Sequence, residues 1–283
     1  MSPACHRESR SGDRMTESTE SRLRADTHVH FHACFEEGPF LDAAATALKA
    51  GSADTITAVL CLTESHDANW FGRLTELDEN TEVGNSGWRK KKTQDNNSVI
   101  VSDSNGRRLA IIAGRQIVSK ERLEVLALGY ANLFDDGEPI RSVLNHVSDT
   151  GALPVVPWGF GKWAGSRGEI VKQLFEDPPC DFAVGDNGGR LSILSEPALF
   201  GTARSKGYSI LPGTDPFPFR WDSHRAGTFG IEWRGSLDPD TPFESLKALI
   251  LDQSRAGEPF GHLERLPAFV RNQVAIQLRR FAS

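Results

Sequence analysis

The sequence predicts an α/β protein in which short strands alternate with helices, as in βα units around a parallel sheet. Two observations predict this class. Short β-branched runs recur along the 283 residues with helical segments between them, and a composition of 39% hydrophobic and 25% charged residues supplies a sizeable core. A chain of this length fits one β/α barrel with tails, and two compact domains are also compatible with it.

The N-terminal segment 1–24 alternates Ser, Glu and Arg with few apolar residues, so we expect a disordered tail before a single domain at 25–283. It has no hydrophobic region of the kind found in signal peptides. The best apolar run, Ile56 to Leu62, has the length of a buried strand, far below the ~20 residues that span a bilayer. We therefore expect no membrane insertion.

The folded region begins with a βαβ unit. The expected elements are a strand from Ala25 to His30, a helix from Phe40 to Ala50, and a strand from Asp54 to Leu62. Gly51 is a plausible C-cap of the helix. The polar segment 65–97 has no clear strand, so we expect a long excursion on one face of the barrel.

An antiparallel element is expected next. Ser98 to Ser102 and Leu109 to Ala113 resemble strands, and Asn105-Gly106 between them suggests a hairpin turn. Further strands are expected at Glu124–Leu128, Leu153–Pro157, Asp181–Val184 and Tyr208–Leu211. Helices are expected at Glu138–Thr150, Glu169–Glu176 and Pro197–Lys206, with C-terminal helices at Thr241–Ser254 and Leu263–Phe281 inside 241–283.

Three histidines gather at the end of the first expected strand. His28, His30 and His32 alternate along the chain, so they share one face of the strand. Two imidazoles spaced in this way can bind one divalent metal ion, with Asp26 as a further ligand or as a partner that fixes a ring tautomer. The alternative is a set of histidines bonded to backbone and water. A position at the carboxyl end of a strand favours the metal site.

Two further groups follow other strands. Glu64 and His66 repeat the two-residue spacing after the second strand, and Asp215 follows Gly213-Thr214 after a later strand. Asp215 could ligate a metal or accept a proton from water, although a turn aspartate before proline is the simpler reading of that residue alone. The expected metal ligands are His28, His30, His66 and Asp215.

The order of these motifs resembles that of the PHP (polymerase and histidinol phosphatase) family of metal-dependent phosphoesterases. The family's motifs DxHxH, TDH, Gly-x-Glu and Gly-Ser-Asp-x-His are similar in order to Asp26–His30, Thr63–His66, Gly114–Gln116 and Gly213–Phe217, a resemblance that covers about residues 25 to 230. It implies a distorted (β/α)7 TIM-like barrel, related in logic to amidohydrolases, with metal ligands at the carboxyl ends of the strands.

Several positions depart from the family's pattern. Gln116 stands where the family has a bridging Glu, Glu124 where it has a His, Pro157 where it has a His-Pro pair, and Phe217 where it has the final His. Proline and phenylalanine side chains cannot coordinate a cation. The resemblance therefore implies a reduced site with one or two Zn, Mn or Fe ions.

Cationic and aromatic side chains lie in the expected loops at the strand ends. Arg115, Lys162 and Arg220 could bind an anionic group, and Trp158 could wall a pocket. For each residue alone, solvated surface charge or ordinary loop packing is the alternative.

The leading hypothesis is a metal-dependent hydrolase of the phosphoesterase kind, in which Asp215 or Glu64 takes the proton from water. A single-metal amide or ester hydrolase and a catalytically silent barrel that binds a ligand or serves a structural role are the alternatives. A net charge of −6 argues against nucleic acid as the main partner and leaves a small, anionic substrate. Four cysteines without CxxC spacing predict a reducing, cytoplasmic compartment.

Overall fold

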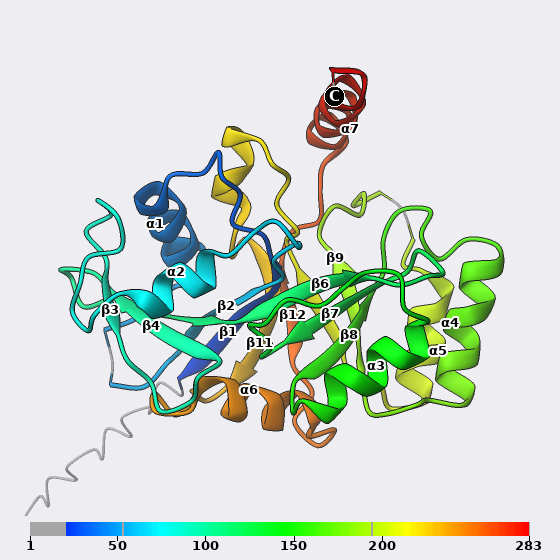
Figure 1. Cartoon of the computed structure of the whole chain (residues 1–283), viewed down its shortest axis with the longest axis horizontal. Coiled ribbons are helices and arrows are strands. Elements are labelled where there is room, and N and C mark those ends of the chain that lie inside the picture. The colour runs from blue at the N-terminus through cyan, green and yellow to red at the C-terminus, as the bar shows by residue number, and fades with distance from the viewer. Residues whose placement is uncertain (1–20, 53, 194, 283) are drawn as a thin grey trace, which may run out of the picture.

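The computed structural model describes residues 21–282 except 53 and 194, and these form two β-sheets with helices outside them (Figure 1). The strands of the first sheet are β1 (Arg22–Val29), β2 (Ala58–Leu62), β3 (Arg89–Lys91), β4 (Ser98–Ser102), β5 (Arg108–Ile112), β11 (Phe229–Arg234) and β12 (Glu258–Gly261). Those of the second are β6 (Gly114–Val118), β7 (Glu124–Leu128), β8 (Leu153–Pro157), β9 (Ala183–Asn187) and β10 (Ile210–Gly213). The spatial orders are β12-β11-β1-β2-β5-β4-β3 and β10-β9-β8-β7-β6.

The helices lie on different sides of the sheets. They are α1 (Glu37–Ala47), α2 (Trp70–Glu76), α3 (Ile140–Asp149), α4 (Ser166–Glu176), α5 (Ala198–Ser205), α6 (Pro242–Leu251) and α7 (Leu266–Ala282), with a 3-10 turn at Arg220–Arg225. Figure 1 shows α1 and α2 on the side of the first sheet, α3 to α5 on the side of the second, and α7 standing away from the body.

The predicted α/β class is confirmed, with a mixed rather than a purely parallel strand arrangement. β1, β2 and β5 are parallel, as are β8, β9 and β10, whereas β7 runs antiparallel to both of its neighbours, β6 and β8. The expected hairpin is present, because β4 and β5 pair antiparallel around Asn105-Gly106.

The two sheets enclose one apolar core. Alternate residues of strands from both sheets point into it, among them Ala25, Cys61, Ala183 and Leu211. The opposite faces of the strands pack against the helices in two further clusters, one under α1 and α2 and one under α3, α4 and α5. Strands buried on both faces explain the continuous apolar runs of the sequence.

The sheets approach each other at two seams without forming one closed ladder among the described residues. At the first seam, the Asp215 N–H after β10 donates to the carbonyl of His28 on β1 (2.8 Å). At the second, the Glu64 N–H after β2 donates to the carbonyl of Gly114 on β6 (2.9 Å). The first seam brings the ends of β1 and β10 together.

Some expected boundaries were wrong. The first strand begins at Arg22, inside the expected tail, because Arg22 and Arg24 pair with Glu232 on β11. The rest of that tail, residues 1–20, lies outside the described residues. The excursion 65–97 contains α2 and β3, although it was expected to have no strand. Strands β6, β11 and β12 were not expected.

Candidate metal centre

The histidines lie where β1 leaves the sheet. The pairing of β1 with β2 shifts register between Asp26 and Val29, which is an irregularity of the β-bulge kind. His28 and His30 are 3% and 9% exposed, so their rings are directed into the molecule instead of solvent. His32 continues the row, and its ring stacks on that of His30 with centroids 5.5 Å apart.

His28, His30 and Asp215 converge on one point. The two Nε2 atoms lie 3.3 Å apart, and Asp215 Oδ1 lies 3.5 Å from that of His28 and 3.3 Å from that of His30. Two imidazole nitrogens and a carboxylate oxygen that face one another in a largely buried place are a donor set that suits Zn²⁺ and related ions. The residues therefore fit the metal that the sequence predicts.

The loop after β10 is shaped to bring Asp215 to this point. A Cβ at Gly213 would lie 2.4 Å from the backbone nitrogen of His28, so only glycine permits the two strands to come this close. Asp215 itself has a φ of 47°, in the left-handed region that few residues other than glycine adopt. Such a conformation is costly unless the surroundings enforce it, and it is often found at functional sites.

Asp26 supports the centre through hydrogen bonds to the chain segments that carry its ligands. Its carboxylate accepts hydrogen bonds from the N–H of Thr214 (2.9 Å), Gly227 (2.8 Å) and His28 (3.3 Å), and from the Thr214 hydroxyl (2.6 Å). Burial raises the pKa of Asp26 to about 6, and these hydrogen bonds oppose the rise. Both oxygens are thus occupied, and Asp26 fixes the ends of β1 and β10 relative to each other.

The protonation states suit metal binding. Burial lowers the pKa of His28 to about 4, with Asp215 opposing the shift and the charges of His30 and Lys162 adding to it. Burial alone would raise the pKa of Asp215, but His28, His30 and Lys162 outweigh burial and hold that pKa below its usual range. His28 is therefore neutral and Asp215 ionised near neutral pH, which are the forms that ligate metals.

Polar partners orient Asp215 and His28. The Asn187 amide at the end of β9 donates to Asp215 Oδ2, and the Gln116 side chain bonds to His28. Gln116 also donates to Glu124 (3.4 Å), which forms an ion pair with Lys162. Such partners fix ring and carboxylate orientation. Asn187 was not among the expected site residues, because the strand was expected to end at Val184 and in fact extends to Asn187. A polar residue at a strand's carboxyl end was the available signal.

Glu64, His66 and Arg115 are not part of this convergence among the described residues. Glu64 Oε1 accepts hydrogen bonds from the N–H of Trp70 and of Phe71 (3.3 Å), so it caps α2. The His66 side chain is 59% exposed beside Asp67. Arg115 is buried, and its guanidinium donates to the carbonyls of Ala131 and Ala68.

The other expected substrate contacts lie in separate places. Of these residues, Lys162 acts on the centre, because its positive charge lowers the pKa of both His28 and Asp215. Trp158 is half-buried and packs against the core under α3 to α5. Arg220 is exposed at the start of the 3-10 turn. The Phe217 N–H donates to Asp222 (2.6 Å), so this residue anchors the loop after β10.

Comparison with known proteins shows similarity of structure. No family model and no curated protein matches the sequence. PsfC from Pseudomonas syringae PB-5123 superposes with a TM-score of 0.54 and 14% identity, over 93% of this chain and all of that one. The lesion-specific endonuclease PfuEndoQ from Pyrococcus furiosus gives 0.49 and 12%, over 85% of this chain and 59% of that one.

A third similar structure bears on the family. It is a two-domain protein from Bacteroides vulgatus ATCC 8482 that contains a predicted PHP-like metal-dependent phosphoesterase, with a TM-score of 0.47 and 14% identity, over 86% of this chain and 66% of that one. The printed name of this structure agrees with the resemblance to the PHP family expected from the motif order, and the likeness of fold is carried by PsfC, at a TM-score of 0.54. At these identities the likeness concerns the fold alone.

One expectation about partners was wrong. The net charge was read as an argument against nucleic acid, but an endonuclease Q of similar structure is known in complex with a 27-mer duplex substrate carrying an abasic lesion. Net charge describes the whole surface and does not report on one groove, so it cannot exclude this class. As for membranes, no helix among the described residues combines the length and apolar character that crossing a bilayer requires.

Proposed function

We propose that this chain is a metal-dependent hydrolase that cleaves phosphoesters, built on a distorted (β/α)7 barrel that is divided into two sheets. The observation that carries the proposal is the convergence of His28, His30 and Asp215 at the carboxyl ends of β1 and β10. The shared core between the sheets supports the barrel reading. Catalytic groups of β/α barrels lie at this end of the strands.

One divalent ion, Zn, Mn or Fe, would be held by His28 Nε2, His30 Nε2 and Asp215 Oδ1. When bound, such an ion lowers the pKa of a water molecule and polarises the scissile bond. We place a single ion here, because the described residues contain no other group of three converging His, Cys, Asp or Glu donors.

The surrounding residues have separate tasks in this proposal. Lys162 binds an anionic oxygen of the phosphoester, since its ammonium acts on the same space as His28 and Asp215 and is partly exposed. Asp215 takes the proton from water. Glu64 does not, because it lies outside the convergence of His28, His30 and Asp215 and caps α2 instead. Gln116 and Asn187 keep His28 and Asp215 in their orientations.

The test joins metal content to activity. Elemental analysis of untagged protein should find about one transition metal ion per chain in the wild type and in His66→Ala, and none in His28→Ala/His30→Ala. His66→Ala is the matched control, because His66 is exposed and outside the convergence. The metal-loaded protein is then assayed on phosphate mono- and diesters, on DNA with an abasic site, and on amides.

A catalytically silent barrel is the second candidate, and the charge of Lys162 favours it. The positive charge of Lys162 acts on His28 and Asp215, and it would oppose a cation bound between them. Full metal occupancy with turnover of a phosphoester supports the hydrolase. Protein that neither retains metal nor takes it up on addition contradicts it and leaves the silent barrel.

A further inference from the structure

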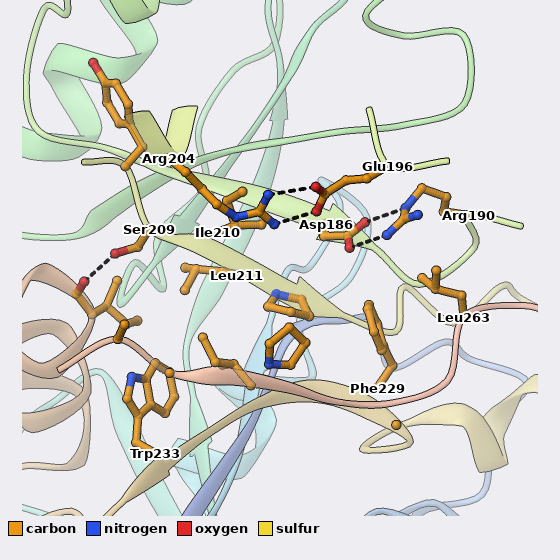
Figure 2. A pocket seen from close by; sticks show the side chains of 18 of the residues that line it. Asp186, Arg190, Glu196, Arg204, Ser209, Ile210, Leu211, Phe229, Trp233 and Leu263 are labelled. Atoms are coloured by element: carbon orange, nitrogen blue, oxygen red, sulfur yellow. Dashed lines mark hydrogen bonds and ion pairs between the residues drawn. The ribbon is translucent and has the colours of Figure 1, made fainter. Parts of the chain in front are cut away.

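A large cavity lies apart from the metal cluster, in the wedge between the two sheets. One wall is β10 with the end of α5, and the other is the antiparallel pair of β11 and β12 (Figure 2). Its volume is about 820 Å³, and neither His28, His30 nor Asp215 lines it. Cavities of about 300–1,000 Å³ are the size that small organic ligands occupy.

The walls that face each other are apolar. Phe229, Ile231 and Trp233 alternate along β11 and therefore present one face to the cavity. Leu211 lines it from the same core face of β10, and its neighbour Ile210 lines it from the face toward α5. Figure 2 shows Ile210, Leu211, Phe229 and Trp233 among the side chains that line the cavity, with Trp233 at one end and Phe229 toward the other. Two facing apolar walls of this kind suit a flat or chain-like apolar body.

Another part of the lining carries charged side chains. Arg190 pairs with Asp186 through two hydrogen bonds (3.1 and 2.9 Å), and Arg204 pairs with Glu196 in the same way. Both pairs lie along the same side of the cavity in Figure 2. Their guanidinium groups are already matched by carboxylates, so they supply polarity and fixed geometry more than free charge.

Two further arginines lie at the rim. Arg265 is exposed, lines the cavity, and has no ion-pair partner in the part of the chain that the structure describes. Arg255 lines it as well, and one of its terminal nitrogens donates to the carbonyl of Arg234 (3.0 Å). Altogether four arginines and three carboxylates line this cavity, in a chain whose net charge is −6. The local excess of positive charge therefore runs against the charge of the whole molecule.

We propose that this cavity is a second binding site, for a small amphipathic carboxylate whose apolar body lies between β10 and β11 and whose carboxylate meets Arg265 at the rim. The apolar walls determine the body of the ligand and the unmatched arginine determines its head group. The site is separate from the proposed hydrolase centre and does not depend on that proposal.

Decanoate is the probe, with 1-decanol as the neutral control, in isothermal titration of the full chain. Wild-type protein should bind one decanoate per chain. Arg265→Glu should weaken decanoate by about fivefold or more, equivalent to about 1 kcal/mol, and leave 1-decanol unchanged. Arg89→Glu is the matched control, because Arg89 is exposed on β3 and makes the same charge change away from the cavity.

A second variant tests the cavity itself. Ile210→Trp fills the space from β10 and should abolish binding of both probes, whereas Leu133→Trp, at an exposed position outside the lining, should bind as the wild type does. Thermal unfolding of each variant checks that it folds. If Ile210→Trp does not fold, the comparison of Arg265→Glu with the wild type still decides the proposal. Absence of saturable decanoate binding, or equal binding by Ile210→Trp, overturns the proposal. The proposal is also overturned if the wild type is a dimer and Ile210→Trp is a monomer, because a second copy of the chain would then occupy the cavity.

Discussion

At the scale of single residues, Asp26 is the side chain on which the centre depends without belonging to it. Four donors converge on its two oxygens, three of them backbone N–H groups. Asp26→Asn places an NH₂ group against one pair of those donors. A buried donor without an acceptor costs ~1–3 kcal/mol, and more where a charged group was engaged. We expect the free energy of unfolding to fall by about 2–4 kcal/mol in urea titrations.

Thr214→Val is the control for this change, because it removes only the hydroxyl that reaches Asp26. Its loss should be smaller, about 1 kcal/mol. An Asp26→Asn protein as stable as the wild type would show that the carboxylate is not the group that joins β1 to the loop after β10.

Lys162 allows a residue-scale prediction about catalysis. Its ammonium acts on His28 and Asp215 and is held by Glu124, so we assign it to the anionic oxygen of the substrate. Removing one such electrostatic contact costs about 10²–10³ in kcat. Lys162→Met should lose activity on this scale, with metal content retained or increased, since a repelling charge near the ligands is gone.

Lys172→Met is the matched control for Lys162→Met. Lys172 forms an exposed ion pair with Glu169 on α4, so its loss should change neither activity nor metal content. Lysine replacements that behave alike would remove Lys162 from the substrate site and strengthen the silent-barrel alternative.

At the scale of elements, Glu232 fixes the pairing of β1 with β11. It accepts from Arg24 (2.7 Å) directly across the ladder and from Arg22 (2.5 Å) two residues earlier. Burial raises the pKa of Glu232, but the two arginines outweigh burial and lower it from 4.5. A carboxyl with a lowered folded-state pKa stabilises the protein above its unfolded-state pKa, and this contribution is lost as pH falls through the folded-state pKa.

Glu232→Gln should therefore be less stable than the wild type near neutral pH, by about 0.5–1 kcal/mol after allowance for solvent screening. The difference should shrink as pH falls below 4.5, where the wild-type carboxyl also becomes protonated. Urea titrations across this range measure it. Glu169→Gln, in an exposed pair on α4, should show a smaller difference at every pH.

Some strands could be predicted from the sequence and others could not, and the difference has a physical cause. Strands such as β2 and β8 were located from their continuous runs of apolar residues, because burial on both faces of a strand leaves this pattern in the sequence. β3 and β12 were missed: their residues, Arg-Lys-Lys and Glu-Pro-Phe-Gly, have no β-branched run. They are strands because a neighbouring strand pairs with them, and pairing with a distant partner leaves no local signal.

At the scale of the whole molecule, the same difference between local and distant signals explains which site residues could be recognised from the sequence. His28 and His30 were recognised because their spacing is local, and Asp215 because it follows a strand. Glu64 was assigned to chemistry because it has the same relation to its strand, yet its carboxylate caps α2. Whether a residue at a strand end faces the centre or a neighbouring helix depends on a register that the sequence does not record.

The metal centre should also hold the two sheets together. His28 and His30 follow β1 of the first sheet, and Asp215 follows β10 of the second, so an ion bound by all three spans the seam between them. A ligand that binds only the folded state stabilises it, by about 2.7 kcal/mol at a concentration 100-fold above its Kd. For a protein of this size, that corresponds to a rise in Tm of roughly 5–10 °C.

Chelation of metal-loaded wild-type protein should lower Tm by this amount, measured by circular dichroism, and added metal should restore it. His66→Ala should respond as the wild type does, because its imidazole lies outside the convergence. Asp215→Asn keeps the shape of the side chain and loses its charge, so it should lose most of the response to chelator. An equal fall in Tm for Asp215→Asn and wild type would place the ion elsewhere, and no fall in the wild type would mean that no ion joins β1 to the loop after β10.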